Sequence, residues 1–410
     1  MPEEPAPAGA FSLPAGRSLM PSGPGVRGKG APSAGSDRAL NAVANVLFSF
    51  SLGTLSVVVP LLAVHAGYSP SQVGLLVAVA AVAQIATRLC MGALMRTFAD
   101  KWFLLGAALL ITGSCALMAC SDTLLVLALA QLVQGASRAL FWTSSQTHAV
   151  RTSSSAVAAL RDVNLAAGTG ALIGPAAAGY LWEVSVQLPL LAGAAAGALA
   201  VCPLLLIIKF PPFKGKESAP GGSEKHLWRR PGVDTACWMN AAAGGWKSLL
   251  DSYVPVVLSL AGQPAVIIGV LMSTANATVL AGSAVGGWVR GKGIRASLAT
   301  GVLAAGLGLA AAGLSASWAA AAAAALALSG MGAGILQTVG PAIAAETVHP
   351  EERGDALAVT GTFRASALFL APFGMAGLVT VIPVAAALFA AGLFIAAPAA
   401  ATWRPGRRGT

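Results

Sequence analysis

Twelve apolar segments separated by short polar connections constrain the fold of this 410-residue chain more than any other feature. Each segment has about 20 apolar residues, which is enough for an α-helix to cross a bilayer. They fall at 39–65, 72–95, 103–119, 123–149, 157–182, 188–209, 235–260, 265–289, 296–315, 318–346, 355–378 and 381–402. The sequence therefore predicts an all-α integral membrane protein with 12 transmembrane helices.

The composition agrees with a membrane protein. Hydrophobic residues make up 56% of the chain, charged residues 10%, and the mean hydropathy is +0.75. Soluble domains carry about 25% charged residues. The net charge of +10 is spread over short connections, where it suits anionic lipid headgroups. We therefore expect contact with a lipid bilayer and no nucleic-acid partner.

Lys and Arg are distributed very unevenly between the two sides of the predicted membrane. Of the 25 basic residues, 21 fall in segments that share one side, and the connections on the other side contain none. Basic loops stay on the cytoplasmic side of a membrane. We therefore expect a multi-pass protein of the cytoplasmic membrane, with both termini cytoplasmic.

The polar segments divide the chain into parts. Residues 1–38 are rich in Pro, Gly and Ser, which predicts a disordered cytoplasmic tail. A six-helix half is expected at 39–210, a cytoplasmic linker at 211–234, a second six-helix half at 235–403, and a short tail at 404–410.

The two halves resemble each other at a nearly constant offset. A shift of 195 aligns Pro60 with Pro255, Gly74 with Gly269 and Gly92 with Gly287, and a shift of 197 aligns Gly135 with Gly332 and Pro175 with Pro372. Such a parallel repeat predicts two pseudo-symmetric halves with a binding site between them, as in secondary transporters.

A glycine pattern in the fifth segment carries a family resemblance. The stretch GTGALIGPAAAGY contains Gly170, Gly174, Pro175 and Gly179, with Ala178 where a further Gly is expected. It resembles a motif in the fifth helix of exporters of the major facilitator superfamily, and the resemblance extends over 39–403. It implies proton-coupled efflux by antiport. Plain helix packing is the alternative interpretation, because small residues let membrane helices approach closely.

Two other motifs of that superfamily are altered here. In GALMRTFADKW, Gly92 matches, but Arg96 stands where the family has Asp, so we expect Asp100, four residues later, to be its partner. In QLVQGASRALFW, Gln134 and Gly135 match, while the family's Arg position holds Gln131. Arg138 lies seven residues further on nearly the same helix face, and we infer that it takes over that role.

Four basic residues, Arg88, Arg138, Lys247 and Arg364, fall inside apolar segments, where a charge is costly without a partner or a polar cavity. The functional hypothesis is that Arg138 and Arg364 bind an anionic substrate, since arginine binds carboxylate and phosphate well. The alternative is structural, with Lys247 paired to Asp251 and the arginines holding helices together. A third role is proton coupling by Asp251. For Arg88 we expect a side chain that extends to the membrane surface.

Uncharged polar and aromatic residues are further candidates for the cavity. Those placed in the binding site are Asn45, Gln134, Trp142, Asn240 and Gln337. The alternative for each is an interhelical hydrogen bond or an anchor at the membrane surface.

The chemistry-bearing motifs of enzymes are missing from the sequence. The four histidines fall at segment ends or in loops, and there is no HExxH, GxSxG or phosphate loop. We expect no catalytic activity and no bound metal or cofactor. We also expect the protein to be a monomer. The predicted function is proton-coupled efflux of a small organic molecule by alternating access, and the anionic-substrate hypothesis above is one version of it. Import of a small organic anion is the first alternative. A non-transporting membrane sensor or an intramembrane enzyme is the second.

Overall fold

The computed structural model describes residues 34–153, 156–212, 227–349 and 352–402. Its long helices are α1 Ala34–His65, α2 Pro70–Thr97, α3 Asp100–Cys120, α4 Leu124–Thr152, α5 Ala156–Val184, α6 Leu188–Leu206, α7 Val233–Leu260, α8 Ala265–Arg290, α9 Ile294–Leu314, α10 Ala319–Glu346, α11 Arg353–Leu378 and α12 Val384–Ala396. A 3-10 turn, η1 Leu227–Arg229, and a short helix, α13 Ala399–Thr402, complete the elements. The all-α prediction with 12 long helices is confirmed.

Nine of the described helices are long and apolar enough to cross a membrane, and α12 is a shorter apolar helix. The last predicted segment is divided between α12 and α13. The predicted N-terminal tail, 1–38, is too long, because residues 34–38 already belong to α1. The rest of that tail, most of the linker (213–226) and the tail at 404–410 lie outside the described residues.

Local sequence signals set several helix boundaries. Ser69 caps α2: its hydroxyl accepts a hydrogen bond from the Gln72 amide, and the Gln72 side chain accepts one from the Ser69 amide at 2.8 Å. Pro70 then occupies the first helical position, where its missing N–H costs nothing. Gly232, with a φ of 92°, precedes α7 and adopts a conformation that favours glycine.

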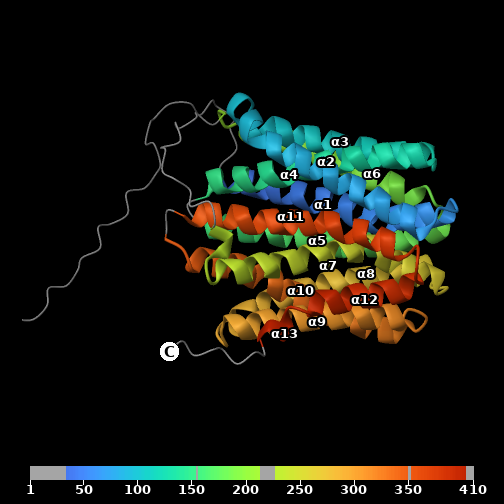
Figure 1. The fold of residues 1–410 in the computed structure, drawn as a ribbon. Coiled ribbons are helices and arrows are strands. Elements are labelled where there is room, and N and C mark those ends of the chain that lie inside the picture. The colour runs from blue at the N-terminus through green and yellow to red at the C-terminus, as the bar shows by residue number, and fades with distance from the viewer. Residues whose placement is uncertain (1–33, 154–155, 213–226, 350–351, 403–410) are drawn as a thin grey trace, which may run out of the picture. The chain divides into compact units, whose positions relative to one another are not determined.

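The helices run side by side (Figure 1), and their contacts repeat in the two halves of the chain. In the first half α1 packs on α5 and α6, and α4 packs on α2 and α3. In the second, α7 packs on α11 and α12, and α10 packs on α8 and α9. Adding six to each helix number of the first half reproduces the second. The predicted pseudo-symmetry is therefore present in the packing.

The two halves meet through α1 with α7, α2 with α11, and α5 with α8. Glycines permit two of these contacts. A Cβ on Gly269 of α8 would lie 2.4 Å from the Pro175 carbonyl oxygen of α5, and a Cβ on Gly74 of α2 would lie 3.0 Å from that of Pro372 in α11. These are the residues that the internal repeat aligned. The same glycine–proline contact thus occurs twice, once on each side of the pseudo-twofold axis.

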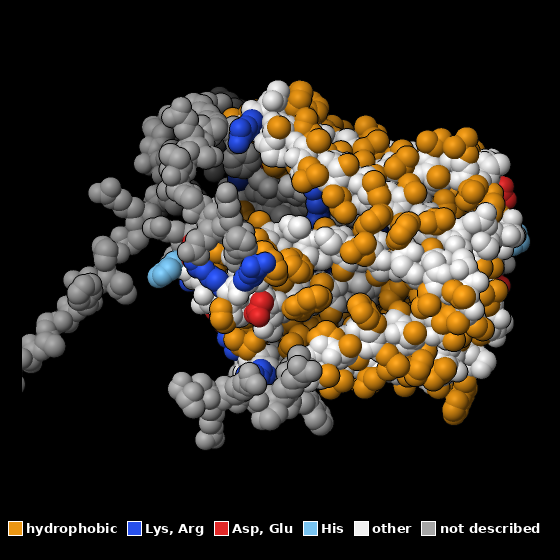
Figure 2. All heavy atoms as spheres, viewed as in Figure 1, with side chains coloured by type: hydrophobic (Ala, Val, Ile, Leu, Met, Phe, Trp, Pro, Cys, Tyr) orange, Lys and Arg blue, Asp and Glu red, His pale blue; other side chains and the backbone are white. Residues whose placement is uncertain are grey.

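We call the end of the bundle where α2, α4 and α8 finish the basic end, because Arg96, Arg151 and Arg290 lie there. Lys and Arg side chains gather at this end, on the left of Figure 2, and hydrophobic side chains cover the flank of the bundle. The other end is called the opposite end. Its described connections contain no Lys or Arg.

A buried Asp–His–Asp cluster (Asp37, His148, Asp100) joins three helices near the basic end. His148 of α4 lies 2.8 Å from an Asp37 carboxylate oxygen of α1 through Nε2, and 3.2 Å from an Asp100 oxygen of α3 through Nδ1. All three residues are almost fully buried. The second Asp37 oxygen accepts a hydrogen bond from the Ile208 amide at 2.6 Å. The cluster thus also fixes the chain segment that leaves α6.

Neighbouring basic side chains complete this attachment. Lys101 donates to the carbonyls of Leu205 and Ile207 at 2.7 and 3.0 Å, which satisfies oxygens at the end of α6. Arg151 lies 3.7 Å from Asp100 and 4.6 Å over the ring of Phe210. The basic ends of α1, α3, α4 and α6 are therefore held as a unit.

The expected pairing of Arg96 with Asp100 is wrong. Helix α2 ends at Thr97 and Asp100 begins α3, so the two residues are not one turn apart on a single helix. Asp100 is buried against His148 and Arg151, whereas Arg96 is exposed.

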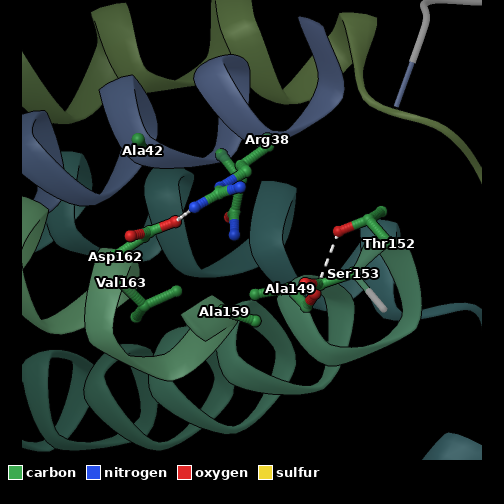
Figure 3. A pocket seen from close by; sticks show the side chains of 9 residues that line it. Arg38, Ala42, Ala149, Thr152, Ser153, Ala159, Asp162 and Val163 are labelled. Carbon is green, nitrogen blue, oxygen red and sulfur yellow. Dashed lines mark hydrogen bonds and ion pairs between the residues drawn. The ribbon is translucent and has the colours of Figure 1, made fainter. Parts of the chain in front are cut away.

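A second ion pair ties α1 to α5. Arg38 of α1 pairs with Asp162 of α5, and Figure 3 shows the two side chains pointing toward each other. They line a cavity of about 10 Å³ between α1, α4 and α5, which is room for about one water molecule. This cavity is therefore too small to hold a substrate.

In the second half, Arg230 joins Glu352 at 2.8 Å, which links the segment before α7 to the start of α11. The hydrogen bond from Arg230 lowers the pKa of the half-buried Glu352 carboxyl. The pair is therefore a surface contact that weakens as the pH falls toward the pKa of Glu352.

We predict that Gly179→Ala separates α5 from α8 and lowers the melting temperature of the protein. A Cβ there would lie 2.3 Å from the Ala265 carbonyl oxygen, and overpacking of this kind costs about 1–3 kcal/mol. Gly106→Ala in α3 is the control, because a Cβ at Gly106 meets no atom within 4 Å. Equal melting temperatures for both variants would contradict the close helix contact.

We predict that His148→Leu destabilises the protein strongly, because it leaves two buried carboxylates without their shared partner. Breaking a buried ion pair costs about 3–5 kcal/mol. Adding Asp37→Asn and Asp100→Asn to this variant should recover part of the loss of melting temperature. His65→Leu is the matched control, since His65 is exposed at the opposite end. No recovery in the triple variant would argue against charge as the cause.

Candidate functional site

Two opposite charges on α7 pair with each other inside the bundle. On α7 the Lys247 ammonium lies 2.8 Å from an Asp251 carboxylate oxygen and 3.5 Å from the Asn276 side-chain oxygen of α8. The two charged side chains keep 30% and 13% of their exposure. They are therefore paired with each other yet reachable from solvent. The pairing is the one that the structural alternative predicts.

Arg138 places a second cation near the same carboxylate. It lies on α4, in the first half, within electrostatic range of Asp251 in the second half. Its Nε is buried and has no hydrogen-bond partner among the described residues. An unsatisfied guanidinium nitrogen inside a bundle is costly. The arrangement leaves a donor available where the two halves face each other.

A second cationic centre lies between α2 and α11. Arg364 of α11 donates to the Gln337 side-chain oxygen of α10 at 3.4 Å. The charge of Arg88, an exposed residue of α2, opposes that of Arg364. No carboxylate forms an ion pair with either arginine in the described part of the chain. The influence of Arg88 on Arg364 was not expected from the sequence.

Of the five uncharged candidates, Gln337 is the one that the structure brings to a cation. Asn45 donates to the Ser145 hydroxyl at 2.7 Å and so joins α1 to α4. Asn240 donates to a carbonyl of its own helix at 3.0 Å. The Asn45 bond matches the interhelical alternative, whereas the Asn240 bond lies within α7. Trp142 packs edge-on against Phe48 and Phe141, and Gln134 is buried.

The glycine motif of α5 mediates close helix packing on two sides. A Cβ on Gly170 would lie 2.2 Å from the Val46 carbonyl oxygen of α1, and one on Gly174 would lie 2.6 Å from that of Phe50. Gly179 faces α8. By contrast, a Cβ on Gly92, in the altered loop motif, meets no atom within 4 Å. Gly135 of the α4 motif also makes a close contact, since a Cβ there would lie 2.1 Å from the Ala80 carbonyl oxygen of α2.

A cavity of about 250 Å³ opens at the opposite end, between α1, α5, α7 and α8. Its polar lining includes His65, Glu183, Ser259 and Gln263. The Glu183 side chain accepts a hydrogen bond from the Val266 amide at 3.4 Å, across the two halves. The cationic centres do not line this cavity.

Sequence reasoning missed the Asp–His–Asp cluster, although a signal was present. Asp37, Asn41 and Asn45 recur every four residues and form a polar stripe on one face of α1. The first predicted apolar segment begins at residue 39 and therefore does not include Asp37. The influence of Arg88 on Arg364 had no such signal, because it depends on how α2 meets α11.

Comparisons with known proteins agree with this geometry. A model of the Major Facilitator Superfamily matches residues 42–372. A search of the curated proteins finds no match. Similar solved structures include a variant of the nucleoside transporter NupG, with 13% identity, a TM-score of 0.75, and coverage of 90% of this chain and 100% of the other.

Two further structures have the same fold. One is a bacterial homologue of the human lysosomal transporter Spinster, with 13% identity, a TM-score of 0.70, and coverage of 90% of this chain and 96% of the other. The other is a POT family transporter in complex with 5-aminolevulinic acid, with 12% identity, a TM-score of 0.71, and coverage of 89% and 94%. At these identities the likeness concerns the fold alone. Because the superfamily match spans most of the chain, the protein is a multi-pass membrane transporter rather than an enzyme, and it belongs to the major facilitator superfamily.

Proposed function

We propose that this transporter carries a small organic anion, and that protons drive its export. The observation that supports an anionic substrate best is Arg364, at the meeting of α2 and α11, which has no carboxylate partner among the described residues and is opposed by the charge of Arg88. Two cations within electrostatic range of each other and without a counterion repel each other. A bound anion removes that repulsion and gains charge-assisted hydrogen bonds.

Arg138 is the third cationic contact in this proposal. Its buried Nε has no partner among the described residues, so a carboxylate or phosphate oxygen would satisfy it. Arg138 and Arg364 stand on opposite halves, in α4 and α11. A ligand that touches both halves can hold them in one arrangement and be released in the other, as alternating access requires.

Asp251 is the proposed proton carrier. Its carboxylate is paired with Lys247 at 2.8 Å and remains partly exposed. Protonation of Asp251 would break its ion pair with Lys247 and change the charge near Arg138. Proton and substrate occupancy are thereby linked through one carboxylate.

Export is supported by the α5 glycine motif, which resembles that of antiporters and packs tightly here. The solved structures of similar fold bear the names of transporters with different substrates, so they do not select a substrate. Direction is therefore tested in cells. Expression should lower the accumulated anion, and a protonophore should abolish the difference. Import would give the opposite sign.

We predict that Arg364→Gln weakens binding of the transported anion by about tenfold or more, since a hydrogen bond to a charged group contributes about 1.5–3 kcal/mol. The measurement is thermal stabilisation of the purified protein by a panel of organic anions, sugars and lipophilic cations. Arg138→Gln should act similarly. Arg96→Gln is the control, because Arg96 is exposed at the basic end. Stabilisation by lipophilic cations alone would refute an anion site.

We predict that Asp251→Asn abolishes proton-driven transport but leaves substrate exchange across proteoliposomes intact, because exchange requires no net proton movement. The readout is uptake driven by a pH gradient compared with counterflow at equal pH. Asp122→Asn, in an exposed connection at the opposite end, serves as the control. Gradient-driven transport at the wild-type rate in Asp251→Asn would show that another group carries the proton.

A further inference from the structure

A serine of one half forms hydrogen bonds with two backbone groups of a helix in the other half. The Ser273 hydroxyl of α8 donates to the Leu172 carbonyl of α5 at 2.7 Å and accepts from the Ala176 amide at 3.0 Å. In an uninterrupted α-helix these two backbone groups bond to each other, because they are four residues apart. Ser273 is 8% exposed, so water does not compete freely for either group.

The position of this contact follows from Pro175. Proline has no N–H and its ring pushes against the preceding turn, which opens the helix locally. The bond from Ala176 to Leu172 is the next one along the chain. It lies near a close contact of α5 and α8, at Gly179 and Gly269. The bend in α5 therefore admits a hydroxyl from α8.

These bonds belong to the seam that holds the halves together. Between described residues, the hydrogen bonds that cross from one half to the other all join α5 to α8. The third is the bond from the Val266 amide to Glu183 at the opposite end. We call this set the α5–α8 seam.

We propose that Ser273 is a positioning residue for transport, and that its hydroxyl couples the bend of α5 to closure of the two halves at the opposite end. When the seam parts, the Ala176 amide can return to the Leu172 carbonyl within α5, and the Ser273 hydroxyl can bond to a carbonyl of its own helix. Every polar group keeps a partner in both arrangements. The exchange therefore stabilises the closed seam without blocking its opening.

The other seam provides an internal comparison. In α11 the carbonyl left unpaired by Pro372 is that of Leu368, and it accepts a hydrogen bond from Ser248 of α7 at 2.8 Å. This serine belongs to the same half as the helix that it satisfies. At an offset of 195, Ser273 corresponds to Ala78 of α2. The α2–α11 contact thus lacks the crossing hydroxyl, and the coupling is confined to α5 and α8.

The test measures the separation of the two halves directly. Cysteines introduced at Asp122 and Ser317 lie in exposed connections at the opposite end, one in each half. They are spin-labelled in a background where the five native cysteines, all free, are replaced. Distance distributions then report the fraction of molecules in which the ends are apart.

Ser273→Ala should raise the separated fraction relative to the joined fraction about threefold, the effect of one average hydrogen bond between membrane helices. Ser248→Ala is the matched control: it removes the same group from a proline kink but within one half, so the distances should not change. The readout does not depend on the anion, the proton or the direction of transport. Failure of the proposed function therefore leaves this result intact, and the reverse also holds.

Ser273→Thr and Ser273→Val form a second pair that differs in the hydroxyl alone, for use if Ser273→Ala does not fold. The threonine variant should retain the wild-type distances and the valine variant should shift toward separation. An unchanged distribution when the hydroxyl is removed, or an equal shift in Ser248→Ala, would overturn the proposal.

Discussion

The absence of water from the bilayer core is the constraint on which this structure depends. Every backbone N–H and C=O within the membrane must find a partner in the protein, which restricts the chain to helices. Proline interrupts that pattern inside α1, α5, α6, α7, α10 and α11. In α5 and α11, serine hydroxyls from neighbouring helices bind the carbonyls near the interruption. The bends of these helices are thus maintained by their neighbours.

Close packing of glycines replaces the hydrophobic effect as the force between helices, since lipid tails are as apolar as the side chains they surround. Carbonyl oxygens of α5 and α11 approach Gly269 and Gly74 so closely that a Cβ on either would lie within 3.0 Å. The same contact on both sides of the pseudo-symmetry axis explains why the two halves meet in equivalent ways. The polar side chains do not follow the pseudo-symmetry of the two halves. The functional hypotheses rest on these differences between the halves.

Charge within the bundle is handled in two ways. Near the basic end, Asp37, Asp100 and Asp162 each have a cationic or histidine partner, so their burial is compatible with stability. Between the halves, Asp251 is paired with Lys247, but Arg88 and Arg364 have no carboxylate partner among the described residues. Compensated charges hold helices together, whereas the uncompensated ones mark the place where a ligand of opposite sign is expected.

The sequence alone determined the helices and the internal repeat, because hydropathy over about 20 residues and glycine–proline spacing are local properties. It also located the intramembrane charges, since any such residue is exceptional. Only the tertiary structure decided their partners. Asp100 contacts His148 and not Arg96, because α2 ends at Thr97. Asn45 donates a hydrogen bond to the Ser145 hydroxyl. The electrostatic influence of Arg88 on Arg364 and the hydrogen bond from Ser273 to α5 both join segments that are far apart in the chain. Such contacts depend on helix rotation and approach, which no local pattern specifies.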